Sequence, residues 1–288
     1  MPGNDGLKVT NELGIKAPGI RRTLVAREDF QIARSGERTN AAGKPVSNMV
    51  LLSIPDSEYL AIRPHLEFLS MPHHLSLYEP NDPLEFVYFP NGGMVSLVIA
   101  TEDGRTVEVG EVGKEGIAGI PAAVGMKRSQ VREVVQIAGN GFRIRVGAWQ
   151  SVLRSTPQSQ MILTRYAVVQ GLQIAQTAAC NRLHNIEQRF ARWLLITQDR
   201  VDSARFAITH DFLAMMLGTD RPTVSLAAGI LQKKQVIVYT RGAVQILSRA
   251  KLENCACECY EAIQLDRYGE GPLRLGKTFK PRTRRADR

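Results

Sequence analysis

The chain has 288 residues, of which 44% are hydrophobic, and a formal net charge of +9 at pH 7. This length leaves room for two ordinary domains, and the positive charge favours an anionic partner without distinguishing DNA, RNA and a membrane surface. No apolar run approaches the ~18 residues of a membrane span, and the first residues lack the apolar core of a signal peptide. Four cysteines without an export signal favour a reducing compartment, so we expect a cytoplasmic protein.

Residues 1–45 are rich in Gly, Asn, Arg and Lys and show no sustained period, which predicts a disordered arm. The arm either touches DNA phosphate with its basic residues or is a plain solvated tail. Order is expected to begin near Val46, and residues 46–150 contain short apolar runs separated by turn signals such as Asp103-Gly104. Short strands at regular spacing predict a small β barrel or sandwich.

A long helix is predicted for residues 158–183. Its apolar stripe recurs at spacings of 7, 4, 3, 4 and 4, which is close to a heptad seam. The stripe either packs on the preceding β-domain or pairs with the same helix of a second chain. It consists of Met161, Val168, Leu172, Ala175, Ala179 and Leu183. A hinge is expected at His184-Asn185, followed by an amphipathic helix over 186–201.

The stretch 209–237 predicts two helices joined by a tight turn. Thr209 is a good N-cap for the first helix, and Gly218 can adopt the left-handed conformation that ends it. Asp220 can cap the second helix, and Pro222 falls in its first turn, where a missing N–H costs nothing. Two helices with such a turn form either a helix-turn-helix or an ordinary helical hairpin in a core.

The second helix, 221–233, has two distinct faces. The face expected to pack inward consists of Val224, Ala227, Ala228 and Leu231. The opposite face carries no acidic residue and consists of Arg221, Ser225, Gly229 and Gln232. This polar face suits a DNA major groove, with the N-terminal residues nearest the bases.

Two short β-branched runs follow, Val236–Tyr239 and Val244–Leu247, around the turn signal Arg241-Gly242. Two helices followed by a hairpin with a basic tip predict a winged helix-turn-helix. The region 186–265 closely resembles the DNA-binding domain of the Crp/Fnr family of bacterial transcription regulators, on the strength of the run Phe212–Val224 and of Leu252–Tyr260.

A second resemblance lies upstream. Residues Leu77–Pro90 look like the opening of a cyclic-nucleotide-binding β-roll, and Glu108–Gly116 look like its middle. The likeness to Crp/Fnr regulators therefore covers about residues 46–265. It implies an α+β chain with a β-roll sensor domain at 46–150, a dimerisation helix region at 151–185, a winged helix-turn-helix at 186–265 and a basic disordered tail at 266–288.

The resemblance also implies DNA contacts. Arg221 matches the family arginine that contacts guanine, which an arginine can do through O6 and N7. Pro222 and Leu226 stand where a cyclic-AMP-binding member of the family has a base-reading Glu and a second Arg, so the operator sequence does not carry over. Ser225 belongs to the same outer face. The residues expected to contact phosphate are Thr209, His210, Thr223 and Arg241.

The β-roll departs from the family's nucleotide-binding pattern. From Gly116 to Pro121 it has no carboxylate for the ribose hydroxyl, although Arg128 and Ser129 match the pair that holds the cyclic phosphate. A buried sugar hydroxyl without its partner costs ~1–3 kcal/mol, so we do not expect cyclic AMP as the ligand. The degenerate ligand-binding candidates are Gly116, Arg128 and Ser129.

No metal is expected either. Some Fnr-type regulators hold an iron–sulfur cluster on N-terminal cysteines, whereas this chain has no cysteine before Cys180. Cys255, Cys257 and Cys259 are expected at i, i+2 and i+4 of one helix, where only the outer two share a face. Cys180 is expected to be a buried apolar residue, and no histidine has a spaced partner that indicates zinc.

These observations predict a cytoplasmic, homodimeric, sequence-specific DNA-binding transcription regulator with a signal-controlled β-roll. Its expected partners are double-stranded DNA with an inverted-repeat operator and RNA polymerase, and no membrane. The main alternative is a nucleotide-sensing module whose C-terminal domain binds a protein. A regulated enzyme is a weaker alternative, because no nucleophile elbow, phosphate-binding glycine loop or catalytic triad is present. The signal, the direction of regulation and the target genes are not encoded in recognisable motifs.

Overall fold

The computed structural model describes residues 33–240 and 242–263. All of these residues belong to one compact unit. The predicted tail at 266–288 and most of the predicted N-terminal arm lie outside the described residues.

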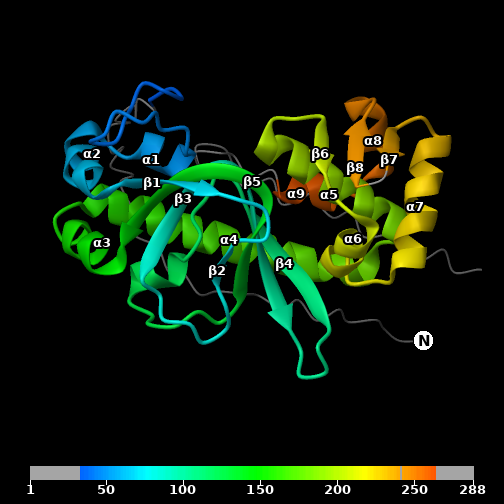
Figure 1. The fold of residues 1–288 in the computed structure, drawn as a ribbon, viewed down its shortest axis with the longest axis horizontal. Coiled ribbons are helices and arrows are strands. Elements are labelled where there is room, and N and C mark those ends of the chain that lie inside the picture. Colours follow the sequence, from blue (N-terminus) through cyan, green and yellow to red (C-terminus); the bar gives the residue numbers. More distant parts are fainter. Residues whose placement is uncertain (1–32, 241, 264–288) are drawn as a thin grey trace, which may run out of the picture. The chain divides into compact units, whose positions relative to one another are not determined.

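The N-terminal part is an antiparallel sheet with short helices around it (Figure 1). The strand order is β1-β5-β3-β4, and β2 pairs with another stretch of β5. The strands are β1 (Glu67–Met71), β2 (Ser76–Tyr78), β3 (Phe86–Ala100), β4 (Thr106–Val112) and β5 (Arg132–Arg145). The helices are α1 (Met49–Ser53), α2 (Asp56–Ile62), η1 (Arg63–His65), η2 (Ile120–Val124) and α3 (Val146–Leu153). The core of this roll includes Phe89, Phe142 and Trp149, none of which is accessible to solvent.

The long strands β3 and β5 bend where Gly93 of β3 lies against Gly139 of β5. The β3–β5 register shifts between Pro90 and Val95. Gly93 has a φ of 78°, and a Cβ on Gly139 would lie 2.1 Å from the carbonyl oxygen of Gly92. Only glycine fits this close approach of two backbones, which lets the strands curve into a roll.

The prediction that order begins near Val46 is wrong for residues 33–45. Arg38 is only 8% exposed, donates from Nη1 to the Leu51 carbonyl at 2.7 Å and lies over the Tyr59 ring. The side chain of Asn40 is buried and donates to the Leu66 carbonyl at 3.0 Å. These contacts join segments distant in sequence, so no local hydrophobic periodicity predicts them.

A long helix links the roll to the C-terminal part. Helix α4 spans Pro157–Leu183, and α5 spans Ile186–Val201. Between them His184 has extended backbone angles, and Asn185 begins α5 with a capping box to Gln188. The hinge predicted at His184-Asn185 is therefore a real break between two helices.

The C-terminal part is a winged helix-turn-helix (Figure 1). Its three-stranded sheet has the order β6-β8-β7. The elements are β6 (Arg205–Ala207), α6 (His210–Met216), α7 (Arg221–Lys233), β7 (Ile237–Thr240), β8 (Ala243–Ile246), α8 (Arg249–Cys255) and α9 (Cys259–Ile263). The α+β class and the order of sheet, long helix and winged helix-turn-helix are confirmed.

Candidate nucleic-acid interface

Side-chain caps define the turn between α6 and α7. The hydroxyl of Thr209 accepts the Phe212 N–H at 3.2 Å, and the Asp220 carboxylate accepts the Thr223 N–H at 2.7 Å. Gly218 has a φ of 56°, the left-handed conformation expected at the end of α6. Both caps and the glycine act as predicted, so the start of α7 is fixed by local chemistry.

Helix α7 has one buried face and one exposed face. The buried face consists of Val224, Ala227, Ala228 and Leu231, each at most 1% exposed. Arg221, Pro222, Ser225 and Leu226 are exposed, and Leu226 is 67% exposed although it is apolar. The side chains at the start of α7 are therefore accessible to a partner.

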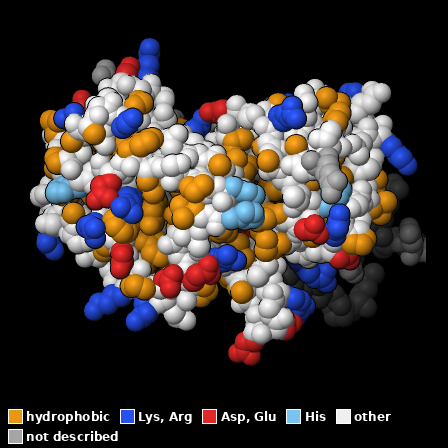
Figure 2. Space-filling view, in the orientation of Figure 1, with side chains coloured by type: hydrophobic (Ala, Val, Ile, Leu, Met, Phe, Trp, Pro, Cys, Tyr) orange, Lys and Arg blue, Asp and Glu red, His pale blue; other side chains and the backbone are white. Residues whose placement is uncertain are grey.

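Arg221 lies at the first position of α7, beside an acidic residue of α6. Its Nε is 3.6 Å from Oδ1 of Asp211, and the two side chains are 65% and 71% exposed. Figure 2 shows acidic and basic side chains next to each other over α6. A pair this exposed is weak, so it does not hold the guanidinium away from an anionic partner.

His210 is bonded within the protein. Its Nδ1 lies 2.9 Å from the Ser225 hydroxyl, which itself donates to the Arg221 carbonyl, and its ring centroid lies 4.1 Å from that of Tyr239. Burial and the charge of Arg221 lower the pKa of His210. His210 therefore joins the start of α7 to the wing, and both it and Ser225 already have protein partners.

The wing is joined to the helix at a second point. The Tyr239 N–H donates to Oε1 of Gln232 at 2.9 Å, and the Tyr239 hydroxyl donates to the Ile208 carbonyl at 2.6 Å. Arg241, the predicted wing contact, lies outside the described residues. Thr209 is exposed and Thr223 half-buried at the N-termini of α6 and α7, where backbone N–H groups favour phosphate.

The three ligand candidates in the roll do not converge on an open site. Arg128 donates from Nη1 to the Asn81 carbonyl at 2.6 Å. Ser129 is 1% exposed, and its hydroxyl donates to the Val131 carbonyl at 2.6 Å. A Cβ on Gly116 would lie 2.2 Å from the Tyr166 hydroxyl of α4, so α4 packs tightly over this loop.

A buried polar contact joins the roll to α5. Arg200, only 6% exposed, pairs with Glu111 and, at 2.6 Å, with Glu115. The indole N–H of Trp193 donates to Glu108 at 2.9 Å. Burial and the neighbouring Glu111 carboxylate raise the pKa of Glu108. The strand β4 therefore contacts the first helix of the DNA-binding part directly.

A second contact joins the roll to α6. The rings of His73 and His74 stack at 3.7 Å between centroids, and that of Phe212 lies 6.0 Å from His74. Histidine side chains gather near the middle of the face drawn in Figure 2, beside apolar side chains. Desolvation and then the charge of its neighbour lower the pKa of His73. The roll therefore contacts both α5 and α6.

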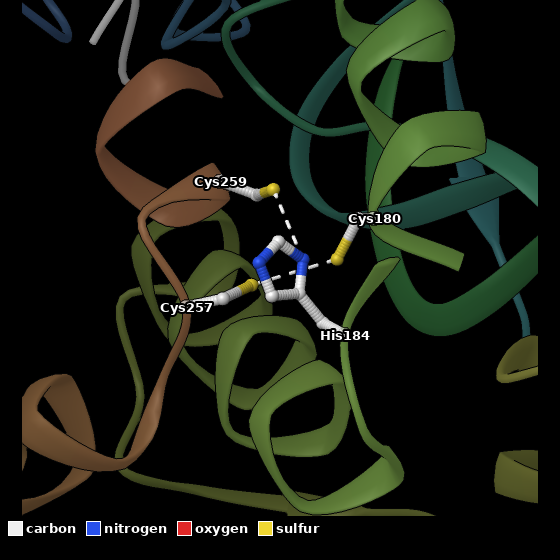
Figure 3. Close-up of side chains that lie close together, drawn as sticks. All are labelled: Cys180, His184, Cys257 and Cys259. Atoms are coloured by element: carbon white, nitrogen blue, oxygen red, sulfur yellow. Dashed lines mark hydrogen bonds between the residues drawn. The ribbon is translucent and has the colours of Figure 1, made fainter. Parts of the chain in front are cut away.

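Sequence reasoning missed one cluster. The side chains of Cys180, His184, Cys257 and Cys259 converge from the end of α4 and from the α8–α9 segment (Figure 3). The expectation that Cys255, Cys257 and Cys259 share one helix is wrong, because α8 ends at Cys255 and Ala256 is extended. Cys180 is buried as predicted, but its neighbours are two other thiols and an imidazole.

Comparisons with known proteins agree with this geometry. A family model described as the Crp-like helix-turn-helix domain matches residues 188–255, which span α5 to α8. Residues 188–255 therefore form a Crp-like helix-turn-helix domain. A search of curated proteins found no match to the chain.

Solved structures establish the fold over both parts of the chain. FixK2 from Bradyrhizobium japonicum is 17% identical, with a TM-score of 0.58 over 67% of this chain and 98% of its own. The c-di-GMP-responsive global regulator CLP of Xanthomonas campestris is 14% identical, with a TM-score of 0.57 over 67% of this chain and 100% of its own. A CRP-family transcriptional regulator of Thermus thermophilus is 20% identical, with a TM-score of 0.55 over 65% of this chain and 96% of its own.

Among the described helices, none is both long and apolar enough to cross a membrane.

Proposed function

We propose that this Crp/Fnr regulator is a homodimer that binds double-stranded DNA through α7 and responds to a signal at its β-roll. The observation that carries the proposal is the exposed start of α7, where Arg221 points from the first position of a helix fixed by Asp220 and supported by the wing through His210. A helix N-terminus with an exposed arginine suits a major groove edged by phosphates. Such a regulator works in the cytoplasm, beside the DNA and RNA polymerase.

The dimer is supported by the surface of α4. Met161, Val168 and Leu183 are 58%, 60% and 73% exposed on the single chain, and Leu172 is 38% exposed. They belong to the stripe with near-heptad spacing, whereas the opposite face of α4 packs on the roll through Leu163, which is 3% exposed. The stripe therefore does not pack on its own roll. A second copy of α4 covers it best, because the same spacing recurs along both helices.

The signal is not cyclic AMP in this proposal. The predicted phosphate-binding side chains, Arg128 and Ser129, bond to backbone carbonyls of the roll, and Tyr166 closes the loop at Gly116. The contacts of Arg200 and Trp193 with β4 give any signal in the roll a route to α5. The proposal assigns no enzymatic step to the chain.

A DNA shift assay tests this function. The purified chain is expected to retain a subset of genomic fragments against an excess of random competitor DNA, because base contacts add discrimination to phosphate attraction. Equal binding to all fragments, with loss of binding at moderate salt, would show that the protein binds DNA only through non-specific attraction to phosphate. No binding at all would favour the alternative in which the C-terminal domain binds a protein.

A further inference from the structure

The end of α4 and the α8–α9 segment contribute four metal-ligating side chains to one point. One ligand atom each from Cys180, His184, Cys257 and Cys259 lies within 4.8 Å of the other three. The sulfurs of Cys180 and Cys257 are 3.5 Å apart, and the sulfur of Cys259 is 3.5 Å from Nδ1 of His184. In a tetrahedral zinc site with Zn–S near ~2.3 Å, ligand atoms lie about 3.8 Å apart. The four atoms therefore approach a closed tetrahedral set.

The local backbone explains this convergence. Cys180 and His184 are one helical turn apart, and the His184 N–H donates to the Cys180 carbonyl at 3.1 Å, so both side chains leave the last turn of α4 on one face. On the other side the chain is extended at Ala256, and α9 begins at Cys259. Figure 3 shows the two cysteines of this segment facing the α4 pair.

The surrounding side chains orient these ligands. Nε2 of His184 lies 3.3 Å from Oε1 of Glu258, an arrangement that places the proton on Nε2 and leaves Nδ1 for the cluster. Histidine ligands in metal sites typically donate their other N–H to a carboxylate in this way. Nε2 of Gln176 donates to the Cys259 sulfur at 3.0 Å. If the three thiols were buried only as apolar side chains, neither the carboxylate of Glu258 nor the amide of Gln176 would be needed beside them.

A Cys180–Cys257 disulfide explains less of this geometry. The two sulfurs are 3.5 Å apart, well beyond the ~2.05 Å of a bond, and a disulfide would leave His184 and Cys259 without a role. Three thiolates and an imidazole are the soft ligands that select zinc over magnesium or calcium. Four protein ligands leave no open position, which is typical of a structural site rather than a catalytic one.

We propose that Cys180, His184, Cys257 and Cys259 bind one zinc ion per chain and join α4 to the C-terminal helices across the hinge at His184-Asn185. Cys180 and His184 belong to the end of α4, and Cys257 and Cys259 belong to the α8–α9 segment of the C-terminal part, so the ion limits how far that part turns about α4. Our prediction of no metal did not consider these four residues together, because the pair on α4 and the pair after α8 are distant in sequence. Metal content is measured without DNA, so a negative result for zinc would leave the proposed DNA binding untouched, and a negative result for DNA binding would leave the zinc site untouched.

The test uses the untagged full-length chain, purified under reducing conditions. Elemental analysis is expected to find about one zinc per chain, and cobalt exchange is expected to give the visible absorption of tetrahedral thiolate-bound cobalt. Cys257→Ser should lose the zinc, whereas Cys255→Ser, which alters a neighbouring cysteine outside the cluster, should keep it. Glu258→Gln keeps the fold of the segment and should weaken zinc affinity about 10–100-fold.

Thiol labelling keeps the test decisive if Cys257→Ser does not fold. In the wild-type chain, Cys255 should react while Cys180, Cys257 and Cys259 stay protected until a chelator removes the zinc. Several outcomes would overturn the proposal: no bound zinc or cobalt, protection unchanged by chelator, a Cys180–Cys257 disulfide in the reduced protein, or a brown sample with stoichiometric iron in place of zinc.

Discussion

Glu133 in β5 provides a stability test that can be worked out from the structure. Its side chain is 2% exposed, and its carboxylate accepts the Gly119 N–H at 2.8 Å. Burial raises the pKa of Glu133 from 4.5 to about 7, and the single hydrogen bond offsets only part of this effect. The folded roll therefore holds a proton on Glu133 where the unfolded chain has already released it.

The sign and size of the effect follow from linkage. An acid whose pKa is raised by folding costs no stability below the unfolded value, and the cost grows as pH rises from about 4.5 to about 7. A rise of this size corresponds to about 3 kcal/mol in the free energy of unfolding. Glu133→Gln keeps an acceptor for Gly119 and cannot ionise. The variant should match the wild type near pH ~4.5 and be more stable by about 3 kcal/mol near pH ~8.

Denaturant unfolding of both proteins across this pH range provides the measurement. Glu115→Gln is the matched control, because the pKa of Glu115 is lowered: burial alone would raise it, but the charge of Arg200 and the hydrogen bonds from Arg200 and the Gly113 N–H together outweigh burial. A carboxylate with a lowered pKa stabilises the fold at neutral pH, so removing its charge should destabilise the protein near pH ~8. Parallel stability curves for wild type and Glu133→Gln would refute the reasoning.

Three further predictions concern the dimer, the ligand and the interface. Replacing both Val168 and Leu172 with Glu places like charges on an apolar seam, so sedimentation should show a monomer. A wild-type chain that is itself monomeric at micromolar concentration would refute the proposed pairing of α4 helices. Calorimetry should detect no saturable cyclic AMP binding in the low micromolar range, and tight stoichiometric binding would contradict the degenerate site. Asp211→Asn removes a carboxylate 3.6 Å from Arg221 and should tighten binding to all DNA about two- to fivefold at low salt. Equal or weaker binding by this variant would show that Asp211 positions Arg221 in a way the exposed pair does not suggest.

The sequence predicted the two helices α6 and α7 and the hairpin that follows them to within about a residue, because their signals are local, whereas it did not predict β6 or the break between α8 and α9. Thr209, Gly218 and Asp220 act through bonds within a few positions, and the inward face of α7 follows from helical periodicity. The exposed stripe of α4 was visible for the same reason. Each feature depends on chemistry within one or two turns of the chain.

The features that sequence reasoning missed depend on contacts between distant segments. Asn40 is ordered because its amide reaches the Leu66 carbonyl, and the three buried sulfurs meet His184 because α8 and α9 fold back to the end of α4. The buried Arg200 was invisible for the same reason, since its partners lie on β4 and the loop after it. Spacing along the chain does not predict such contacts, so the sequence alone assigned Arg38 and Asn40 to a polar, disordered arm.

The central claim is that α7 reads DNA through Arg221, and a binding-site selection at fixed salt tests it most directly. The wild-type dimer should select an imperfect inverted repeat with half-sites about 34 Å apart and a guanine opposite Arg221 in each. Arg221→Ala removes one bidentate contact per half-site, worth ~1–3 kcal/mol of discrimination, so preference at that base pair should collapse while binding to random DNA changes little. Arg241→Ala, at the predicted wing tip, should instead weaken all sequences about equally and reduce the salt dependence. If Arg221→Ala selects the same consensus with the same strength, α7 is not the reading helix.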